Sequence, residues 1–363
     1  QGYSSAASDV YKRQGVQILK KYTDGIEAAS PAKALMTKQH LDSIAKPLNS
    51  LGLLEDVLVG LGAAGCLKRS YKKCVAVMCA DNGVVEEGVT QTDSSITALV
   101  AKNMLSGISS VCTMAKCNGV DVFPIDVGML TEIAGVRVRK TQRGTGNIRK
   151  GPAMTSEQAV SAVLAGIDTV RELKDKGYDM IAAAEMGIGN TTTTSAVLSV
   201  MLDIKPESVT GRGAGLSDTG LANKINVIKD AISLNKPDRN DVLDVLARVG
   251  GFDIAGMAGL FIGGAYYKVP VIIDGIISSA AALAAVQLAP LCRDYMIASH
   301  VSAEPAAQAV MEKLELKPLL NIGMALGEGT GAVSIMPIID MALAMYYDMP
   351  TFAEFGMQEY KKL

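Results

Sequence analysis

Five apolar runs constrain the fold of this chain more than any other feature. Each ends in a polar or acidic residue and is followed by a turn of small residues. The runs are 74-CVAVMCADNG-83, 122-VFPIDVG-128, 180-MIAAAEMG-187, 269-VPVIIDG-275 and 295-YMIASH-300. Apolar strands that alternate with helical segments are typical of a parallel sheet covered on both faces. The sequence therefore predicts an α/β, Rossmann-like large domain with helices on both faces of a parallel sheet.

The polar residues at the ends of these runs predict where a ligand binds. In doubly wound sheets, ligands bind beyond the carboxyl ends of the strands. The side chains expected at that edge are Asp81, Asp126, Glu185, Asp274 and Ser299.

One helix can be read in detail between two of the predicted strands. In 155–177, Thr155 and Gln158 have the spacing of a capping box, and Gly177 suits the C-terminus. Val160, Val163, Leu164, Ile167 and Val170 recur at helical spacing, which predicts one buried face.

The predicted strands divide the chain into a large α/β domain, 70–332, and two helical ends. We expect 28–66 and 333–363 to pack together as a small helical domain. The opening segment 1–14 has neither an initiator Met nor an apolar core, so we interpret it as a non-native or disordered lead-in.

Charge and composition argue against several classes of protein. The 363 residues carry 35 Lys and Arg against 37 Asp and Glu, and aromatic residues make up 4% with no Trp. A nucleic-acid partner would favour a basic excess and stacking aromatics. The apolar stretch 269–291 contains Asp274 and is interpreted as a buried strand and helix, so no membrane partner is expected.

The cysteines and histidines indicate whether the protein has a metal site and in which kind of cellular compartment it works. Six cysteines form no CxxC pair, and there are two histidines, His40 and His300. The sequence therefore predicts no metal site and free thiols in a reducing cytoplasm.

Two glycine motifs associated with nucleotides can be set aside. The segment 60-GLGAAG-65 matches GxGxxG, but the residues before it have a helical pattern, whereas a dinucleotide fingerprint follows a strand. We interpret it as a helix end. This leaves an NAD-dependent dehydrogenase without support, and a GxxxxGK[ST] phosphate loop does not occur.

The segment 185-EMGIGNTTTTSAV-197 has the required context of strand, turn and helix. A glycine turn before a helix N-terminus favours phosphate binding. A plain helix cap by Asn190 or Thr191 is an equally good interpretation of the turn alone. Glu185 would repel a phosphate, so we expect it to face a neutral or cationic part of the ligand.

Three more glycine clusters are best explained by one extended ligand that the backbone surrounds. They are 211-GRGAGL-216, 250-GGFDIAGMAG-259 and 327-GEGTGA-332. Glu328 lies between glycines that would let its side chain project into a cavity, although an exposed turn glutamate is the commoner case. In 299-SHVSAEP-305 a Ser–His catalytic pair is disfavoured because there is no G-x-S-x-G elbow. We expect a polar loop there, with Ser302 as a donor.

Together these segments, with ADNGVVEEGVT, SHVSAEP and TFAEFGM, resemble the nicotinate-nucleotide:dimethylbenzimidazole phosphoribosyltransferase family from about residue 30 to 357. The resemblance implies a homodimeric enzyme that needs no metal or other cofactor. It implies transfer of phosphoribosyl from nicotinate mononucleotide to 5,6-dimethylbenzimidazole, giving α-ribazole phosphate and nicotinate with inversion at the anomeric carbon.

The resemblance also implies roles for residues. Glu328 matches the catalytic glutamate and would act as general base toward the azole, while Glu185 would stabilise positive charge. The residues implied to contact substrate are Asp81, Gly187, Gly189, Asn190, Thr191, Gly211, Arg212, Gly213, Lys224, Asp274, Gly275, Ser302 and Leu326, with Asp274 expected at the ribose hydroxyls.

The chain departs from the family pattern in two places. It has Asn82 where the family more often has histidine, and the acceptor loop 88-GVTQTDSSITALV-100 is unusual. Transfer to another base or to a phenol therefore stays open beside 5,6-dimethylbenzimidazole, as does a non-catalytic nucleotide-binding relative.

Overall fold

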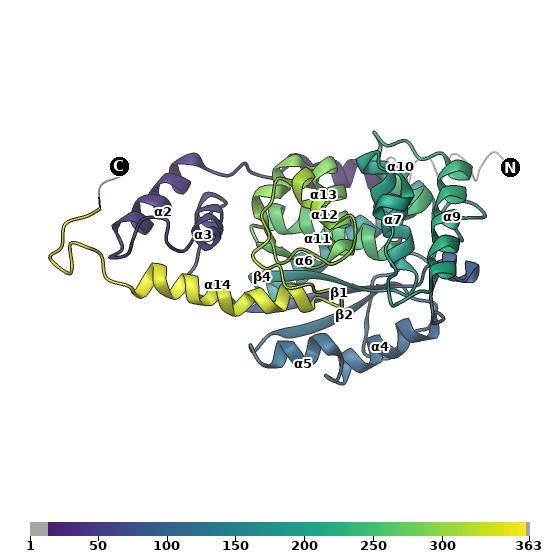
Figure 1. Ribbon diagram of the computed structural model, residues 1–363, viewed down its shortest axis with the longest axis horizontal. Coiled ribbons are helices and arrows are strands. Elements are labelled where there is room, and N and C mark those ends of the chain that lie inside the picture. Colours follow the sequence, from purple (N-terminus) through teal and green to yellow (C-terminus); the bar gives the residue numbers. More distant parts are fainter. Residues whose placement is uncertain (1–13, 361–363) are drawn as a thin grey trace.

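The computed structural model describes residues 14–360, and a six-stranded sheet lies at its centre (Figure 1). The strand order is β3-β2-β1-β4-β5-β6, and the paired strands run parallel. This is the order of a doubly wound, Rossmann-like sheet, so the predicted α/β fold is confirmed. The strands are β1 (Lys73–Ala80), β2 (Asp121–Gly128), β3 (Arg137–Val138), β4 (Met180–Met186), β5 (Val271–Ile273) and β6 (Met296–Ala298).

Helices connect the strands and extend both ends of the chain. The first described helix spans 14–24. The others are α2 (Pro31–Ser43), α3 (Leu53–Ala63), α4 (Ser95–Leu105), α5 (Ser110–Lys116), α6 (Ser156–Asp175), α7 (Asn190–Leu202), α8 (Pro206–Val209), α9 (Asp218–Asn235), α10 (Val242–Val249), α11 (Phe252–Tyr267), α12 (Ile276–Leu288), α13 (Ala307–Leu314) and α14 (Thr330–Asp348). Two 3₁₀ helices are η1 (Gly83–Glu87) and η2 (Pro290–Tyr295).

The winding of the chain reverses between β1 and β4. From β1 the chain builds outward through β2 and β3, and then returns to place β4 on the other side of β1. Every residue of β1 and β4 is buried. Because a crevice opens where the strand order reverses, the carboxyl ends of these two strands are the expected ligand site.

Helices cover both faces of the sheet. In Figure 1, α6 and α11 lie on one face, and α4, α5 and α14 lie on the other. The backbones of α6 and α11 touch, because a Cβ on Gly166 would overlap the carbonyl of Gly256 and a Cβ on Gly259 would overlap that of Val163. This close approach requires glycine and leaves almost all of α11 buried.

Two local predictions are confirmed by the structure. Helix α6 has the capping box: Thr155 Oγ1 accepts from Gln158 N at 3.2 Å, and Gln158 Oε1 accepts from Thr155 N at 2.8 Å. The GxGxxG match at 60–65 lies across the end of helix α3 and follows no strand, so it is a helix end as predicted.

Helices α2 and α3 lie beside the C-terminal helix α14, as Figure 1 shows. Ile44 forms an isolated antiparallel bridge with Thr351, and Phe352 N donates to Ser43 O at 2.9 Å. The division into two domains stays a prediction, and most of the lead-in segment 1–14 lies outside the described residues, although residue 14 itself is helical.

Among the described residues, one helix is long and apolar enough to cross a membrane. It is α14, and half of its most apolar 18-residue window is buried inside the protein. Helices in the core of globular proteins meet the same criterion.

Candidate active site

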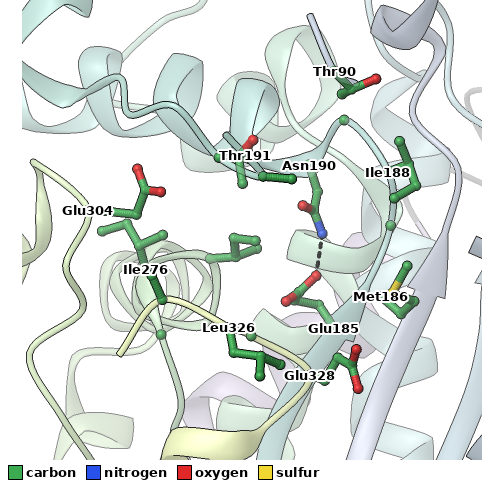
Figure 2. A pocket seen from close by; sticks show the side chains of 18 of the residues that line it. Thr90, Glu185, Met186, Ile188, Asn190, Thr191, Ile276, Glu304, Leu326 and Glu328 are labelled. Carbon is green, nitrogen blue, oxygen red and sulfur yellow. Dashed lines mark hydrogen bonds between the residues drawn. The ribbon is translucent and has the colours of Figure 1, made fainter. Parts of the chain in front are cut away.

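A cavity of about 390 Å³ opens at the carboxyl ends of the strands. Its wall combines the turn after β4, the loop before α14, the start of α12 and the loop 89–92. Figure 2 shows Glu185, Asn190 and Glu328 on one side of it and Glu304 and Ile276 on the other. The predicted site residues in its wall are Glu185, Gly187, Gly189, Asn190, Thr191, Arg212, Gly213, Lys224, Asp274, Gly275, Ser302, Leu326 and Glu328.

The turn from β4 into α7 has no room for larger residues. A Cβ on Gly187 would overlap the carbonyl of Ala80, and Gly189 has a left-handed φ of 91°. Gly189 is the N-cap residue of α7, so no side chain caps this helix. The interpretation of Asn190 or Thr191 as a cap is therefore wrong, and the N-terminal end of α7 faces the cavity with its positive dipole end.

Glu185 lies at the end of β4, beside the α7 N-terminus. Its Oε2 accepts a hydrogen bond from Asn190 Nδ2 (Figure 2). Burial raises the pKa of Glu185 to about 8, and the nearby carboxyl of Asp253 adds to the increase. A carboxyl with this pKa favours a cationic group close to it in the bound ligand.

Glu328 lies in the middle of an unusual backbone turn. Its φ is 60°, between Gly327 at 85° and Gly329 at 96°. A non-glycine residue rarely adopts this left-handed conformation, and strained residues of this kind gather at functional sites. Glu328 Oε2 accepts from Val111 N at 3.4 Å. Partial burial raises the pKa of Glu328, which makes its carboxylate a stronger base.

Lys224 of α9 is almost completely buried beside the α7 N-terminus. Its Nζ donates to Thr191 Oγ1 at 2.8 Å and to Gly211 O at 3.2 Å. Burial lowers the pKa of Lys224 to about 8, while the carboxylate of Glu304 opposes this decrease. A buried ammonium beside a helix N-terminus is well suited to a phosphate.

Two predicted contact residues do not line the cavity. Asp81 is buried below it, where Oδ2 accepts from Leu130 N at 2.8 Å. Gly211 lies behind the wall, although its carbonyl accepts from Lys224. Arg212 reaches the wall but is engaged elsewhere, with Asp218 as an ion-pair partner.

The segment after β6 contributes more to the cavity than its sequence predicted. Ser299 and His300 do contact each other, with 2.9 Å between Ser299 Oγ and His300 Nδ1. Ser299 is buried and its hydroxyl donates to the carbonyl of Asp274 at 3.1 Å, so the pair holds the backbone and is no exposed nucleophile. His300 and Glu304 both line the cavity, and their position just after a strand end is the signal that would have identified them.

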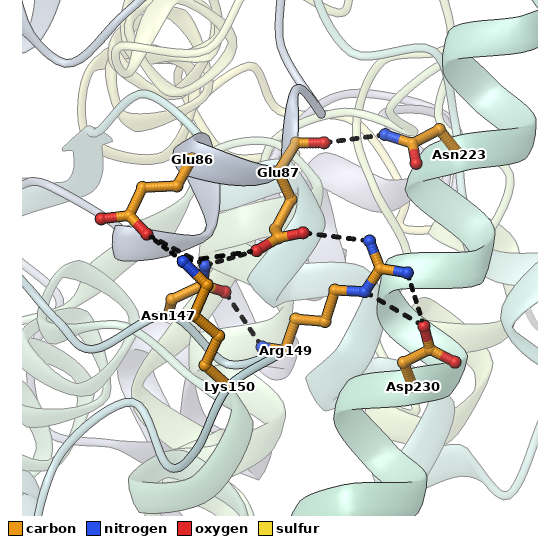
Figure 3. Close-up of polar contacts among 7 residues, drawn as sticks. All are labelled: Glu86, Glu87, Asn147, Arg149, Lys150, Asn223 and Asp230. Carbon is orange, nitrogen blue, oxygen red and sulfur yellow. Dashed lines mark hydrogen bonds and ion pairs between the residues drawn. The ribbon is translucent and has the colours of Figure 1, made fainter.

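Ile96 and Val100 form an apolar rim of the cavity beside the loop 89–92, which is itself mostly polar. A polar cluster anchors the segment just before this loop (Figure 3). Glu87 accepts from Arg149 Nη1 at 3.0 Å and from Asn147 Nδ2 at 2.7 Å, and its carbonyl accepts from Asn223 at 2.8 Å. The start of the loop 89–92 is therefore fixed to the segment 147–149 and to helix α9.

Replacing Glu185 by Gln is expected to stabilise the protein, and more at about pH 8.5 than at about pH 5. The folded-state pKa of Glu185, about 8, lies above the ordinary 4.5, so the folded protein retains a proton that the unfolded chain has released between these values. The carboxyl therefore destabilises the fold increasingly as the pH rises through that window. Gln keeps an oxygen for Asn190, and we expect a gain of about 1–2 kcal/mol at the higher pH.

Urea unfolding of both proteins at the two pH values measures this difference. An equal gain at both values would mean that Glu185 does not titrate in this window.

Comparisons with known proteins cover almost all of the described chain. A family model described as "Phosphoribosyltransferase" matches residues 26–357. The nicotinate-nucleotide–dimethylbenzimidazole phosphoribosyltransferase of Acetivibrio thermocellus is 47% identical over 332 residues, covering 90% of this chain and 94% of that protein. The Clostridium acetobutylicum protein of the same name is 46% identical over 330 residues, with the same coverage.

A solved structure agrees with these sequences. The crystal structure of a nicotinate-nucleotide–dimethylbenzimidazole phosphoribosyltransferase from Thermus thermophilus matches with a TM-score of 0.85 at 35% identity. The match covers 91% of this chain and 100% of that one. The whole cavity wall, 89–328, lies inside the region that the family model matches.

Proposed function

The chain belongs to the nicotinate-nucleotide–dimethylbenzimidazole phosphoribosyltransferase family, and from this membership we propose that it transfers phosphoribosyl from nicotinate mononucleotide to 5,6-dimethylbenzimidazole. The products are α-ribazole phosphate and nicotinate. The observation that carries the proposal is that Glu328 and the N-terminal end of α7 face one cavity.

The donor phosphate occupies the end of the cavity formed by the α7 N-terminus and Lys224. The positive end of the helix dipole and a buried ammonium both favour a dianion there. Thr191 and Ser302 offer hydroxyl donors in the same wall. The pyridinium ring then extends toward Glu185, which meets the positive charge of the leaving group.

The acceptor base lies against the apolar rim. Ile96, Val100, Met186, Ile188 and Leu326 supply a surface that suits a flat aromatic molecule. Its attacking nitrogen points at the anomeric carbon from the side opposite to the pyridinium, and inversion at that carbon follows.

The transfer breaks one C–N bond and forms another. The bonding electrons of the donor C–N bond go to the pyridinium nitrogen, so nicotinate departs without protonation. The azole becomes cationic as its nitrogen bonds to the ribose, and Glu328 takes the proton from its second nitrogen. Glu185 stabilises the positive charge that passes from pyridinium to ribose to azole.

Incubating the purified protein with nicotinate mononucleotide and 5,6-dimethylbenzimidazole tests the proposal. Chromatography should show nicotinate and α-ribazole phosphate in equal amounts, and no nicotinate without the acceptor. Thermal stabilisation by the donor without nicotinate release, with every azole and phenol offered, would instead identify a nucleotide-binding relative that has lost its chemistry.

We also propose a homodimer. Several large apolar side chains of the chain ends face solvent, including Leu35 at 58%, Met36 at 68% and Met341 at 62% exposed. A second copy of the chain would cover such residues. Light scattering after size exclusion measures the mass, and a monomer at micromolar concentration would contradict the proposal.

A cytoplasmic location is proposed from the thiols. All six cysteines are free and five of them are buried, which suits a reducing compartment.

A further inference from the structure

The start of α14 lacks a side-chain cap of its own. The residues before it, Gly327, Glu328 and Gly329, have three successive left-handed φ angles. Gly329 is the N-cap residue and has no side chain to accept from the first turn. Thr330 N donates to Gly327 O at 3.1 Å, and the other N–H groups at the start of the helix need an acceptor from another element.

Asp274, at the end of β5, provides that acceptor from 55 residues away in the sequence. Its Oδ2 accepts from Gly329 N at 3.1 Å, and its Oδ1 accepts from Ala332 N at 3.0 Å. Asp274 is 2% exposed. The carboxylate of Asp274 thus binds one N–H of the turn that contains Glu328 and one N–H of the first turn of α14.

Asp274 is itself held by the neighbouring strands. Its N–H donates to Ser278 Oγ at 3.2 Å, and Ser278 Oγ donates to the carbonyl of Ala183 in β4 at 2.9 Å. Its carbonyl accepts from Ser299 Oγ, which follows β6. The start of α14 is therefore tied to β4, β5 and β6 through this aspartate.

The same carboxylate acts on the charge of Glu328. Burial raises the pKa of Glu328, Val111 N–H opposes this increase, and the negative charge of ionised Asp274 adds to it. Burial also raises the pKa of Asp274 itself, while the Ala332 N–H and His300 oppose that increase. The other titratable groups in this part of the cavity are Glu185 from β4 and His300 after β6.

We propose that Asp274 is the positioning residue for Glu328, holding the backbone turn that presents this general base to the cavity. The inference rests on the proposed function. The expected role at the ribose hydroxyls stays a prediction beside it, because Asp274 lines the cavity and each of its oxygens keeps a second acceptor site besides the backbone N–H.

The substitution Asp274→Asn tests this role. The amide nitrogen of Asn cannot accept, so one backbone N–H loses its partner and the Glu328 turn shifts. A misplaced catalytic group costs about 100-fold in kcat, while the KM for nicotinate mononucleotide should change less than about threefold. The acid limb of kcat/KM should move to lower pH, because the neighbouring negative charge is gone.

Asp126→Asn is the matched control. Asp126 lies near the end of β2 and is also buried. Its Oδ1 accepts from Gly128 N at 3.1 Å and Met129 N at 2.8 Å, and its Oδ2 pairs with Lys140 at 2.9 Å, but it does not line the cavity. Its substitution should lower stability and leave kcat and the pH profile unchanged. Equal losses of kcat in both variants would overturn the positioning role, as would a rise above about tenfold in donor KM for Asp274→Asn with kcat intact.

Amide hydrogen exchange of the wild-type protein supplies a second readout that needs neither a folded variant nor activity. The amides of Gly329 and Ala332 should exchange at least about 100-fold more slowly than open-chain amides, although first-turn amides usually lack partners. Fast exchange at both would overturn the proposal. Slow exchange in a protein that releases no nicotinate would refute the proposed function and leave the cap in place.

Discussion

Glu328→Gln is expected to lower kcat by about two to four orders of magnitude, the usual contribution of a general base. Gln keeps the shape of the side chain and an oxygen for Val111 N–H, but it cannot take the proton from the azole. The KM for nicotinate mononucleotide should change less than about threefold, because the donor phosphate binds at α7 and Lys224. Initial rates at saturating acceptor separate the two constants.

The pH profile adds a second measure of the same variant. The pKa of Glu328 is raised by burial, so the wild-type kcat/KM should fall on the acid side as this carboxylate gains a proton. The Gln variant should lose that limb.

Glu315→Gln is a matched control for Glu328→Gln. Glu315 is also a glutamate with a left-handed φ, 54°, but it lies at the end of α13 outside the cavity wall. Its substitution should leave both constants unchanged. A large rise in donor KM with kcat intact in Glu328→Gln would show that Glu328 binds the donor and does not act as a base.

Lys224→Met is expected to weaken donor binding by about 2–5 kcal/mol, a factor of roughly 30 to 5,000, because a phosphate in this corner would lose its buried cation. The carboxylate of Glu304, which lies in the same wall, would then lack the ammonium that now opposes its charge. Isothermal titration with nicotinate mononucleotide measures the loss. Lys229→Met, on the exposed side of the same helix and paired with Glu207, should bind the donor normally.

Lys224→Met should not destabilise the ligand-free protein near neutral pH. Burial lowers the pKa of Lys224 to about 8 from 10.5, so the folded protein disfavours the charged form that the unfolded chain retains. Wild-type stability therefore rises with pH between these two values, and below about 8 the charged lysine lowers it. A melting temperature at or above that of wild type, together with lost donor binding, is the expected combination; normal donor affinity would contradict the phosphate assignment.

Local patterns were sufficient to predict five of the six strands and the position of Glu185 at the end of β4. Apolar runs ending in polar residues identified five of the six strands, and the spacing of Thr155 and Gln158 identified the start of α6. Strand β3 was not predicted because its two residues, Arg137 and Val138, are too few to show an alternating hydrophobic pattern.

The partners of buried polar groups could not be predicted in the same way. Which atoms the carboxylate of Asp274 faces depends on how α14 docks against β5, and that is a property of tertiary packing. Likewise, whether the adjacent Ser299 and His300 side chains contact each other depends on the backbone conformation after β6. Sequence predicted the chemical types of these residues and left their contacts undetermined.

The buried Glu185 carboxyl in the cavity wall has a consequence for the direction of the reaction. Nicotinate mononucleotide enters with a cationic ring, and a cation beside Glu185 favours the ionised form of this buried carboxyl. Once the glycosidic bond breaks, the departing ring is neutral and this attraction is lost. Under the proposed function, the site therefore binds the leaving group more weakly than the donor from which it came.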